Sequence, residues 1–129
     1  MAKTAFDLSP QERRAYKPDK LIKLRTIEEE RKIKTRYQAS WVLARKAATL
    51  LKSEFGAEKV LVFGSLLHES SFTLWSDIDL SALGIAADKY YAAVAVVSDL
   101  SSSTKIDLID LKSCRPSLRA TILMEGVEL

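Results

Sequence analysis

The chain has 129 residues, of which 47% are hydrophobic and 29% charged, a balance typical of one folded globular domain and not of a disordered segment. No apolar run is long enough to cross a membrane and the first ten residues lack the apolar core of a secretory signal, so we expect a cytoplasmic protein. A single cysteine, Cys114, and a single histidine, His68, exclude an internal disulfide and disfavour zinc sites and serine triads, which leaves carboxylate and hard-metal chemistry.

The net charge of +3 arises in the N-terminal part of the chain. Residues 11–36 contain ten Lys or Arg against five Asp or Glu, whereas residues 37–129 are slightly acidic. We therefore divide the chain into a basic helical extension, residues 1–36, and a folded domain, residues 37–129. The extension is interpreted either as a surface that docks an acidic partner or as a solvated charged helix, and the sequence leaves both interpretations open.

Two helices are expected before the first strand. A serine cap and a following proline at positions 9 and 10 predict a short helix that ends before Pro18. Residues 19–55 contain no Pro or Gly, and their apolar residues recur at steps of three and four, which predicts a long helix. Its second half, residues 41–55, should pack on the core, and Gly56 should end it.

The remaining elements alternate between strands and helices. We predict strands at residues 59–63, 78–82 and 105–111, helices at 86–100 and 116–124, and a loop with a helical turn at 66–75. This order predicts an α/β fold, in which a small mixed sheet is flanked by helices and preceded by the long basic N-terminal helical extension.

Two aspartates stand at the entry to the second predicted strand. Asp77 and Asp79 are separated by one residue, so in a strand their side chains point to the same side. Adjacent carboxylates repel each other unless a counter-charge lies between them, and aspartate oxygens suit Mg²⁺. The alternative is that Asp77 caps a turn and Asp79 is a solvated strand residue.

A glycine and a serine follow the first predicted strand. Gly64 lets the backbone approach a phosphate closely, and the hydroxyl of Ser65 with nearby N–H groups can bind its oxygens. The alternative is an ordinary turn that ends the strand. This pair is not a Walker loop, because the second glycine and the lysine of that motif are absent.

A third candidate carboxylate lies in the strand predicted at 105–111. Asp107 has apolar neighbours, and an aspartate in such a strand is costly unless it lies at an edge or binds a ligand. Asp110 competes for this role, but it points to the opposite face and lies nearer the strand end. We therefore choose Asp107.

Together these motifs resemble the DNA polymerase β-like nucleotidyltransferase superfamily. The matching segments are Val-Phe-Gly-Ser at 62–65, Ser-Asp-Ile-Asp-Leu at 76–80 and Ile-Asp-Leu-Ile-Asp-Leu at 106–111. The short length and the ending at 118–129 resemble the minimal nucleotidyltransferases, which are antitoxins of toxin–antitoxin systems with HEPN toxins. The resemblance covers residues 41–129.

The resemblance implies roles for six residues. Asp77, Asp79 and Asp107 would be the catalytic residues and would bind two Mg²⁺ ions, and Gly64, Ser65 and Ser76 would bind the nucleotide, ATP. The implied reaction transfers AMP from ATP to a tyrosine of a partner HEPN ribonuclease toxin. A different class of function is a nucleotide-binding antitoxin that neutralises the partner by contact alone. A third interpretation, in which the basic extension binds RNA, we rank last.

Two features depart from the family pattern. Many relatives place basic residues after the glycine-serine pair, whereas residues 66–70 read Leu-Leu-His-Glu-Ser, and the following loop is slightly long. In that loop, Phe72 and Trp75 are interpreted either as stacking on a base or as covering the core. His68 is either a phosphate contact or a solvent-facing residue, and Arg119 is either a phosphate contact or a helix-surface residue.

Overall fold

The computed structural model describes residues 25–129, and the chain divides into two units, residues 1–32 and residues 33–129. The helix expected after positions 9 and 10, and the part of the long helix before residue 25, lie outside the described residues. The boundary predicted between residues 36 and 37 stays a prediction.

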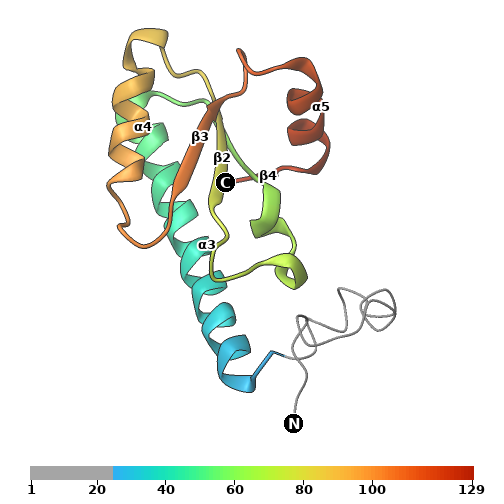
Figure 1. Cartoon of the computed structure of the whole chain (residues 1–129). Coiled ribbons are helices and arrows are strands. Elements are labelled where there is room, and N and C mark those ends of the chain that lie inside the picture. Colours follow the sequence, from blue (N-terminus) through green and yellow to red (C-terminus); the bar gives the residue numbers. More distant parts are fainter. Residues whose placement is uncertain (1–24) are drawn as a thin grey trace, which may run out of the picture. The chain divides into compact units, whose positions relative to one another are not determined.

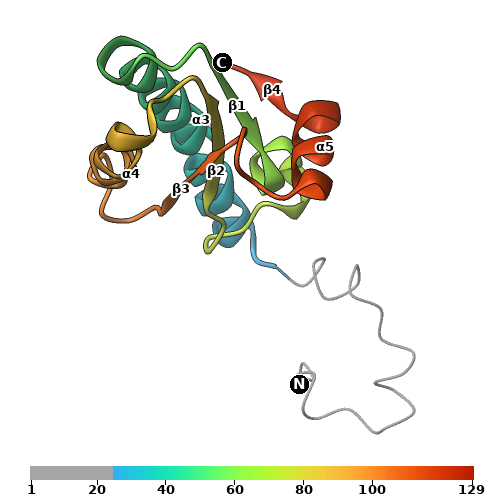
Figure 2. The same ribbon diagram turned by 90° about the horizontal axis from the view of Figure 1, so that it is seen from above.

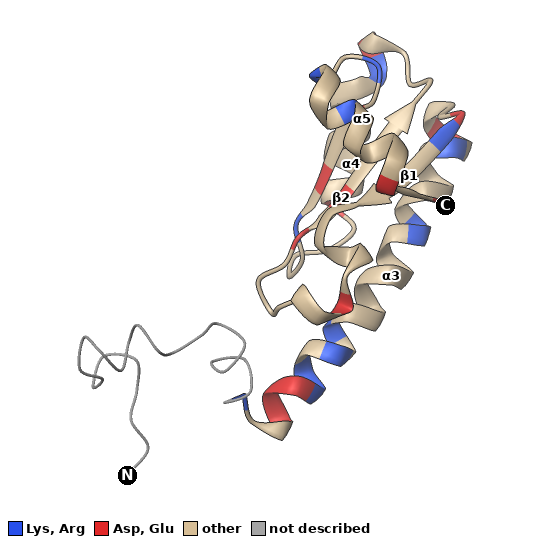
Figure 3. Cartoon of the chain, turned by 90° about the vertical axis from the view of Figure 1, so that its right-hand side faces the viewer, with Lys and Arg blue, Asp and Glu red and all other residues tan. Residues whose placement is uncertain are grey.

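The long helix α3 (Ile27–Phe55) has a defined start and stop. At its start, the Glu29 N–H donates to Oγ1 of Thr26 at 3.0 Å and the Thr26 N–H donates to the Glu29 carboxylate at 3.4 Å, which is a capping box. At its end, Gly56 has a φ of +72°, and the Ala57 N–H donates to the carbonyl of Leu51 at 3.1 Å. Acidic and basic residues follow one another in its first turns, where red and blue segments of the ribbon alternate (Figure 3). The helix and its glycine stop are confirmed, but the prediction that the helix also includes Arg25 and Thr26 is wrong, because the capping box at Thr26 starts it at Ile27.

A four-stranded mixed sheet forms the centre of residues 33–129. Its strands are β1 (Lys59–Phe63), β2 (Ile78–Leu83), β3 (Ile106–Asp110) and β4 (Val127–Glu128), in the order β3-β2-β1-β4. Strand β1 is antiparallel to both β2 and β4, whereas β2 and β3 are parallel. The first three strands were predicted to within about one residue at each end. The fourth was not predicted.

Helices cover both faces of the sheet (Figures 1 and 2). Helices α3 and α4 (Tyr90–Ser98) pack on one face, where most buried residues of β1, β2 and β3 gather around alanines and Leu51 of α3. Helix α5 (Pro116–Glu125) packs on the other face, where Ile122 contacts Leu61 and Leu111. The first turn of the helix predicted at 86–100 is a separate 3-10 turn, Ala87–Lys89. The predicted α/β fold is confirmed.

No helix among the described residues is both long enough and apolar enough to pass through a membrane.

Candidate functional site

The register of the sheet places two of the three predicted carboxylates side by side. Asp79 of β2 lies directly opposite Asp107 of β3, and on its other side lies Phe63 at the end of β1. Ile78 and Leu80 are buried in the core beneath α3 and α4. Because strand side chains alternate between faces, Asp79 points to the opposite face of the sheet, as does Asp107.

The turn after β1 meets Asp79 directly. Gly64 begins a 3-10 turn, Gly64–Leu67, with a φ of +76°, a conformation that favours glycine. A Cβ atom added at Gly64 would lie 2.4 Å from Oδ2 of Asp79, far inside contact distance. The glycine is therefore required both for the turn and for the space in which the carboxylate lies.

Burial and the neighbouring carboxylates raise the pKa of Asp79. Burial is the largest cause, followed by the negative charges of Asp107 and then Asp77, while the positive charge of Lys105 acts in the opposite direction. Lys105 also forms an ion pair with Asp107, with 3.4 Å between Nζ and Oδ1. All three predicted acids therefore belong to one electrostatic cluster at the start of β2 and β3.

The donors of this cluster have the chemistry of a hard-metal site. Carboxylate oxygens are the ligands that Mg²⁺ prefers, and a cation would relieve the repulsion that raises the pKa of Asp79. Within residues 25–129, however, no group of three or more Asp, Glu, His or Cys side chains is already positioned to hold a metal ion. The donor set fits a divalent cation, whereas the side chains do not yet converge on one point.

Arg36 of α3 holds the segments that carry the cluster. Its guanidinium donates from Nη2 to the carbonyl of Ser76 at 3.2 Å and from Nη1 to the carbonyl of Ser103 at 3.3 Å. Ser76 precedes Asp77, and Ser103 lies shortly before β3. The Ile78 N–H also donates to the carbonyl of Lys105 at 2.9 Å, so the two segments are joined twice. Sequence reasoning missed this residue because it assigned Arg36 to the basic extension.

The predicted nucleotide-binding serines differ in their surroundings. Ser76 lies in a turn in which its Oγ accepts a hydrogen bond from the Thr73 N–H at 2.9 Å and lies 3.2 Å from Oγ1 of Thr73. Ser65 is half-buried beside Gly64, and its carbonyl accepts from the His68 N–H at 3.0 Å. Ser65 thus directly follows the glycine that meets Asp79, while the hydroxyl of Ser76 already helps to shape the loop before Asp77.

Asp110 and Arg119, which the sequence left in competition or open, have structural contacts at the far end of β3, as does Cys114. Asp110 accepts from the Lys112 N–H at 3.1 Å and from Oγ of Ser113 at 2.9 Å, so it closes the turn after the strand. Arg119 donates from Nε to the carbonyl of Leu111 at 2.9 Å and from Nη2 to the carbonyls of Lys112 and Cys114 at 2.5 and 3.2 Å. The Cys114 thiol also donates to the carbonyl of Leu111, at 3.4 Å.

The two aromatic residues in the loop between β1 and β2, Phe72 and Trp75, differ in their exposure to solvent. Phe72 is fully buried and meets the ring of Tyr37 edge-on at 5.2 Å, so it is a core residue. Trp75 is 86% exposed, although its backbone N–H donates to Oγ1 of Thr73. His68 is exposed, and its carbonyl accepts from the N–H and hydroxyl of Ser71. Trp75 alone of these side chains is an aromatic surface open to a ligand.

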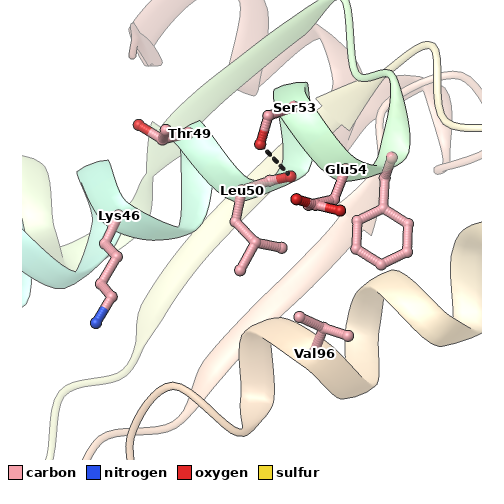
Figure 4. A pocket seen from close by; sticks show the side chains of 7 residues that line it. Lys46, Thr49, Leu50, Ser53, Glu54 and Val96 are labelled. Atoms are coloured by element: carbon pink, nitrogen blue, oxygen red, sulfur yellow. Dashed lines mark hydrogen bonds between the residues drawn. The ribbon is translucent and has the colours of Figure 1, made fainter.

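Asp77 and Trp75 lie in the wall of one polar pocket. The pocket has a volume of about 550 Å³, and its other walls come from Arg36, Leu74, Ser98 and residues 101–106. A second pocket, of about 620 Å³, lies between α3 and α4, where Leu50, Phe55 and Val96 line it (Figure 4). None of the predicted site residues lines that second pocket, whereas Asp77 is the one predicted site residue in the wall of the first.

The sequence matches one described family. The family "Polymerase beta, Nucleotidyltransferase" matches residues 45–129, a range that contains all six predicted site residues. No curated relative matches the chain.

Several solved structures share the fold. One is the toxin–antitoxin MntA–HepT, with a TM-score of 0.51, 18% identity, and coverage of 68% of this chain and 69% of that one. A second is a toxin–antitoxin with AMP-PNP, with a TM-score of 0.55, 20% identity and coverage of 66% and 70%. A third is a tri-AMPylated Shewanella oneidensis HEPN toxin in complex with MNT antitoxin, with a TM-score of 0.52, 19% identity and coverage of 69% and 70%. At these identities the likeness extends to the fold alone.

Proposed function

The chain belongs to the polymerase beta nucleotidyltransferase family, and we propose that it is an antitoxin that transfers AMP from ATP to a tyrosine hydroxyl of a partner HEPN ribonuclease toxin. The observation that carries this proposal is the pairing of Asp79 with Asp107 beside Gly64, inside the part of the chain that matches the family. We place this reaction in the cytoplasm, in keeping with the single cysteine.

The proposed roles follow from the chemistry of each group. Asp77 and Asp79, with Asp107, would hold two Mg²⁺ ions, which when bound neutralise phosphate charge and polarise the reacting phosphoryl group. Gly64 lies beside Asp79, and Gly64 and Ser65 would bind phosphate oxygens through backbone N–H groups and the hydroxyl. Ser76, in the loop before Asp77, would also bind the nucleotide.

Asp107 would also receive the proton of the attacking hydroxyl. The hydroxyl oxygen forms a bond to the α-phosphorus, the bond from that phosphorus to the β-phosphate oxygen breaks, and pyrophosphate leaves with the electron pair. The proton passes to the carboxylate of Asp107 and then to solvent.

The similar structures support the choice of partner. One contains a HEPN toxin that carries three AMP groups together with an MNT antitoxin, and another contains AMP-PNP.

The test is transfer to the protein encoded next to this chain. The full chain is incubated with that HEPN protein, ATP and Mg²⁺, and the HEPN protein is weighed by mass spectrometry. We expect added mass of one or more adenylates, which disappears with a chelator and with the double variant Asp77→Asn/Asp79→Asn. No added mass, or addition that persists in the double variant, would refute the enzymatic proposal.

One observation favours a second function, neutralisation by binding alone. Residues 66–70 contain no Lys or Arg to hold a triphosphate. In that case the Asp77→Asn/Asp79→Asn chain should still bind the toxin and still protect cells. Protection that needs both aspartates would exclude this second function.

A further inference from the structure

Lys105 is a cation of the carboxylate cluster that the proposed roles leave unused. Its ammonium lies 3.4 Å from Oδ1 of Asp107, and its positive charge counteracts the rise in the pKa of Asp79. Both of these carboxylates point to the face of the sheet opposite α3 and α4, so the ammonium of Lys105 reaches that same face. The cluster therefore contains a positive charge before any ligand is bound.

The ion pair between Lys105 and Asp107 contributes little to the stability of the fold. The Lys105 side chain is 70% exposed and the Asp107 side chain 40% exposed, and water screens ion pairs in such surroundings. The segments that begin β2 and β3 are joined instead by hydrogen bonds to backbone carbonyls, from the Arg36 guanidinium and from the Ile78 N–H. The ammonium of Lys105 can therefore change its partner without disturbing the sheet.

Two arginines that could hold a phosphate have backbone partners instead. Arg36 donates to two carbonyls from α3, and Arg119 donates to three carbonyls at the far end of β3. The loop after Gly64 supplies no substitute, because residues 66–70 contain no Lys or Arg. The partner of Lys105, by contrast, is a carboxylate of the cluster itself, to which a metal ion would also bind.

A divalent cation at the aspartates would compete with Lys105 for the carboxylate of Asp107. A carboxylate that binds such a cation attracts a neighbouring ammonium less strongly, and the ammonium is then drawn to the next anion within its reach. The phosphates of a nucleotide are such anions. We propose that Lys105 is a phosphate-binding residue, held by Asp107 in the metal-free chain and released to a phosphate oxygen of the bound nucleotide. This inference rests on the nucleotide binding of the proposed function.

Lys105 and the glycine-serine turn approach the carboxylates from different sides. Gly64 follows β1 and meets Asp79, whereas Lys105 immediately precedes β3, and β2 lies between these two strands (Figure 1). The turn offers backbone N–H groups and the hydroxyl of Ser65, while Lys105 offers a full positive charge on a flexible stem. Lys105 thus complements the turn and supplies the positive charge that residues 66–70 lack.

Two affinities separate this role of Lys105 from the alternatives. Binding of Mn²⁺ alone is followed by the EPR signal of the free ion, and binding of AMP-PNP at saturating Mn²⁺ is followed by calorimetry. The full chain is compared with Lys105→Met and with Lys112→Met, and the Tm of each variant confirms that it is folded. Lys112 is exposed just beyond the other end of β3, so its substitution removes the same charge at a distance from the carboxylates.

We expect Lys105→Met to bind Mn²⁺ about 2- to 5-fold more tightly, because a competing positive charge is gone. The same variant should bind AMP-PNP at least about 10-fold more weakly, through loss of a charged hydrogen bond to phosphate. Lys112→Met should leave both affinities within about 2-fold of those of the unaltered chain, because its charge is screened from the site.

Unchanged AMP-PNP affinity in Lys105→Met would overturn the inference and leave Lys105 as a competitor of the metal ion alone. Weaker AMP-PNP binding without tighter Mn²⁺ binding would also overturn it, since Lys105 and the metal ion would then not compete for Asp107. Equal effects in Lys112→Met would reduce the role of Lys105 to net charge. These affinities do not depend on AMP transfer, so absence of transfer by an unaltered chain that binds AMP-PNP would refute the proposed reaction and not the role of Lys105.

Discussion

Strand β3 contains two aspartates, and the fold treats them in opposite ways. Asp110 at its end accepts two hydrogen bonds, from the Lys112 N–H and from the hydroxyl of Ser113. Asp107 near its start lies opposite Asp79, whose pKa is raised by burial and by neighbouring carboxylates. Both are half-buried, so burial does not separate them.

The difference shows how a carboxylate is made available for chemistry. Asp110 has its partners within the chain and stabilises the turn that follows β3, so it offers little to a ligand. Asp107 and Asp79 repel each other, which costs folding free energy, and a bound cation would remove that cost. The start of the strand is thus arranged for binding and its end for stability.

The largest effect on AMP transfer is expected from removing the Asp107 carboxylate, and removal of the Asp110 carboxylate is the matched comparison. Asp107→Asn should lower AMP transfer by about 10²- to 10⁴-fold, the range for loss of a group that accepts a proton in the transition state. Asp110→Ala should leave the transfer rate unchanged and lower the free energy of unfolding by about 1–3 kcal/mol through loss of hydrogen bonds to a charged group. Initial rates and urea unfolding measure the two effects, and equal loss of transfer in both variants would contradict the comparison.

Substitutions at two glycines distinguish an effect on catalysis from an effect on stability. Gly56 and Gly64 both have positive φ, so alanine at either should cost about 1–2 kcal/mol of unfolding free energy. A Cβ at Gly56 meets nothing within 4 Å, whereas one at Gly64 would strike the Asp79 carboxylate. We expect Gly64→Ala to lower transfer by about 100-fold, as a displacement of about 1 Å can do. Gly56→Ala, the matched control, should transfer normally.

Arg36 joins the two segments that begin β2 and β3, so its removal should affect site and fold together. Arg36→Met loses hydrogen bonds to the carbonyls of Ser76 and Ser103 and should lower unfolding free energy by about 1–3 kcal/mol. Transfer should fall even at temperatures where the variant is folded. Arg45→Met, on the same helix over the ring of Trp41, is the control and should retain transfer. Normal transfer by folded Arg36→Met would contradict this role of Arg36. It would show that the hydrogen bond from the Ile78 N–H to the Lys105 carbonyl is enough to hold the two segments together.

The smallest effect is a gain in stability. Because the folded-state pKa of Asp79 is raised, the folded chain holds this proton more tightly than the unfolded chain does. Ionisation of Asp79 therefore lowers stability as pH rises above 3.8, the ordinary pKa of an aspartate. Asp79→Asn should therefore raise Tm at pH 7 without metal, and the gain should shrink toward pH 4. Asp110→Asn should show no such gain. A lower Tm for Asp79→Asn at pH 7 would contradict the inference that burial and the neighbouring carboxylates destabilise the ionised form of Asp79.

Local signals explain which elements the sequence predicted. The apolar run at 59–63 and the glycine at 56 specify a strand and a helix end without reference to the rest of the chain. Strand β4 could not be predicted, because Val127 and Glu128 become a strand only by pairing with Val62 and Leu61. Its two residues form no pattern of their own.

The same distinction applies to the site. The two-residue spacing of Asp77 and Asp79 predicted a shared side, and the choice of Asp107 over Asp110 agrees with the register. Arg36 was missed because its partners are backbone carbonyls 40 and 67 residues away. One signal was present, since Arg36 lies one helical turn before buried Ser40, on the core side of α3.

The central claim is that the carboxylates at the start of β2 and β3 bind a metal–nucleotide complex. Crystals of the full chain with AMP-PNP and Mn²⁺, examined by anomalous scattering, test it directly. We predict anomalous peaks for Mn²⁺ ions bound by Asp77 and Asp79, and phosphate groups bound at Gly64 and Ser65. A nucleotide bound elsewhere, or manganese bound only by other residues, would contradict the account.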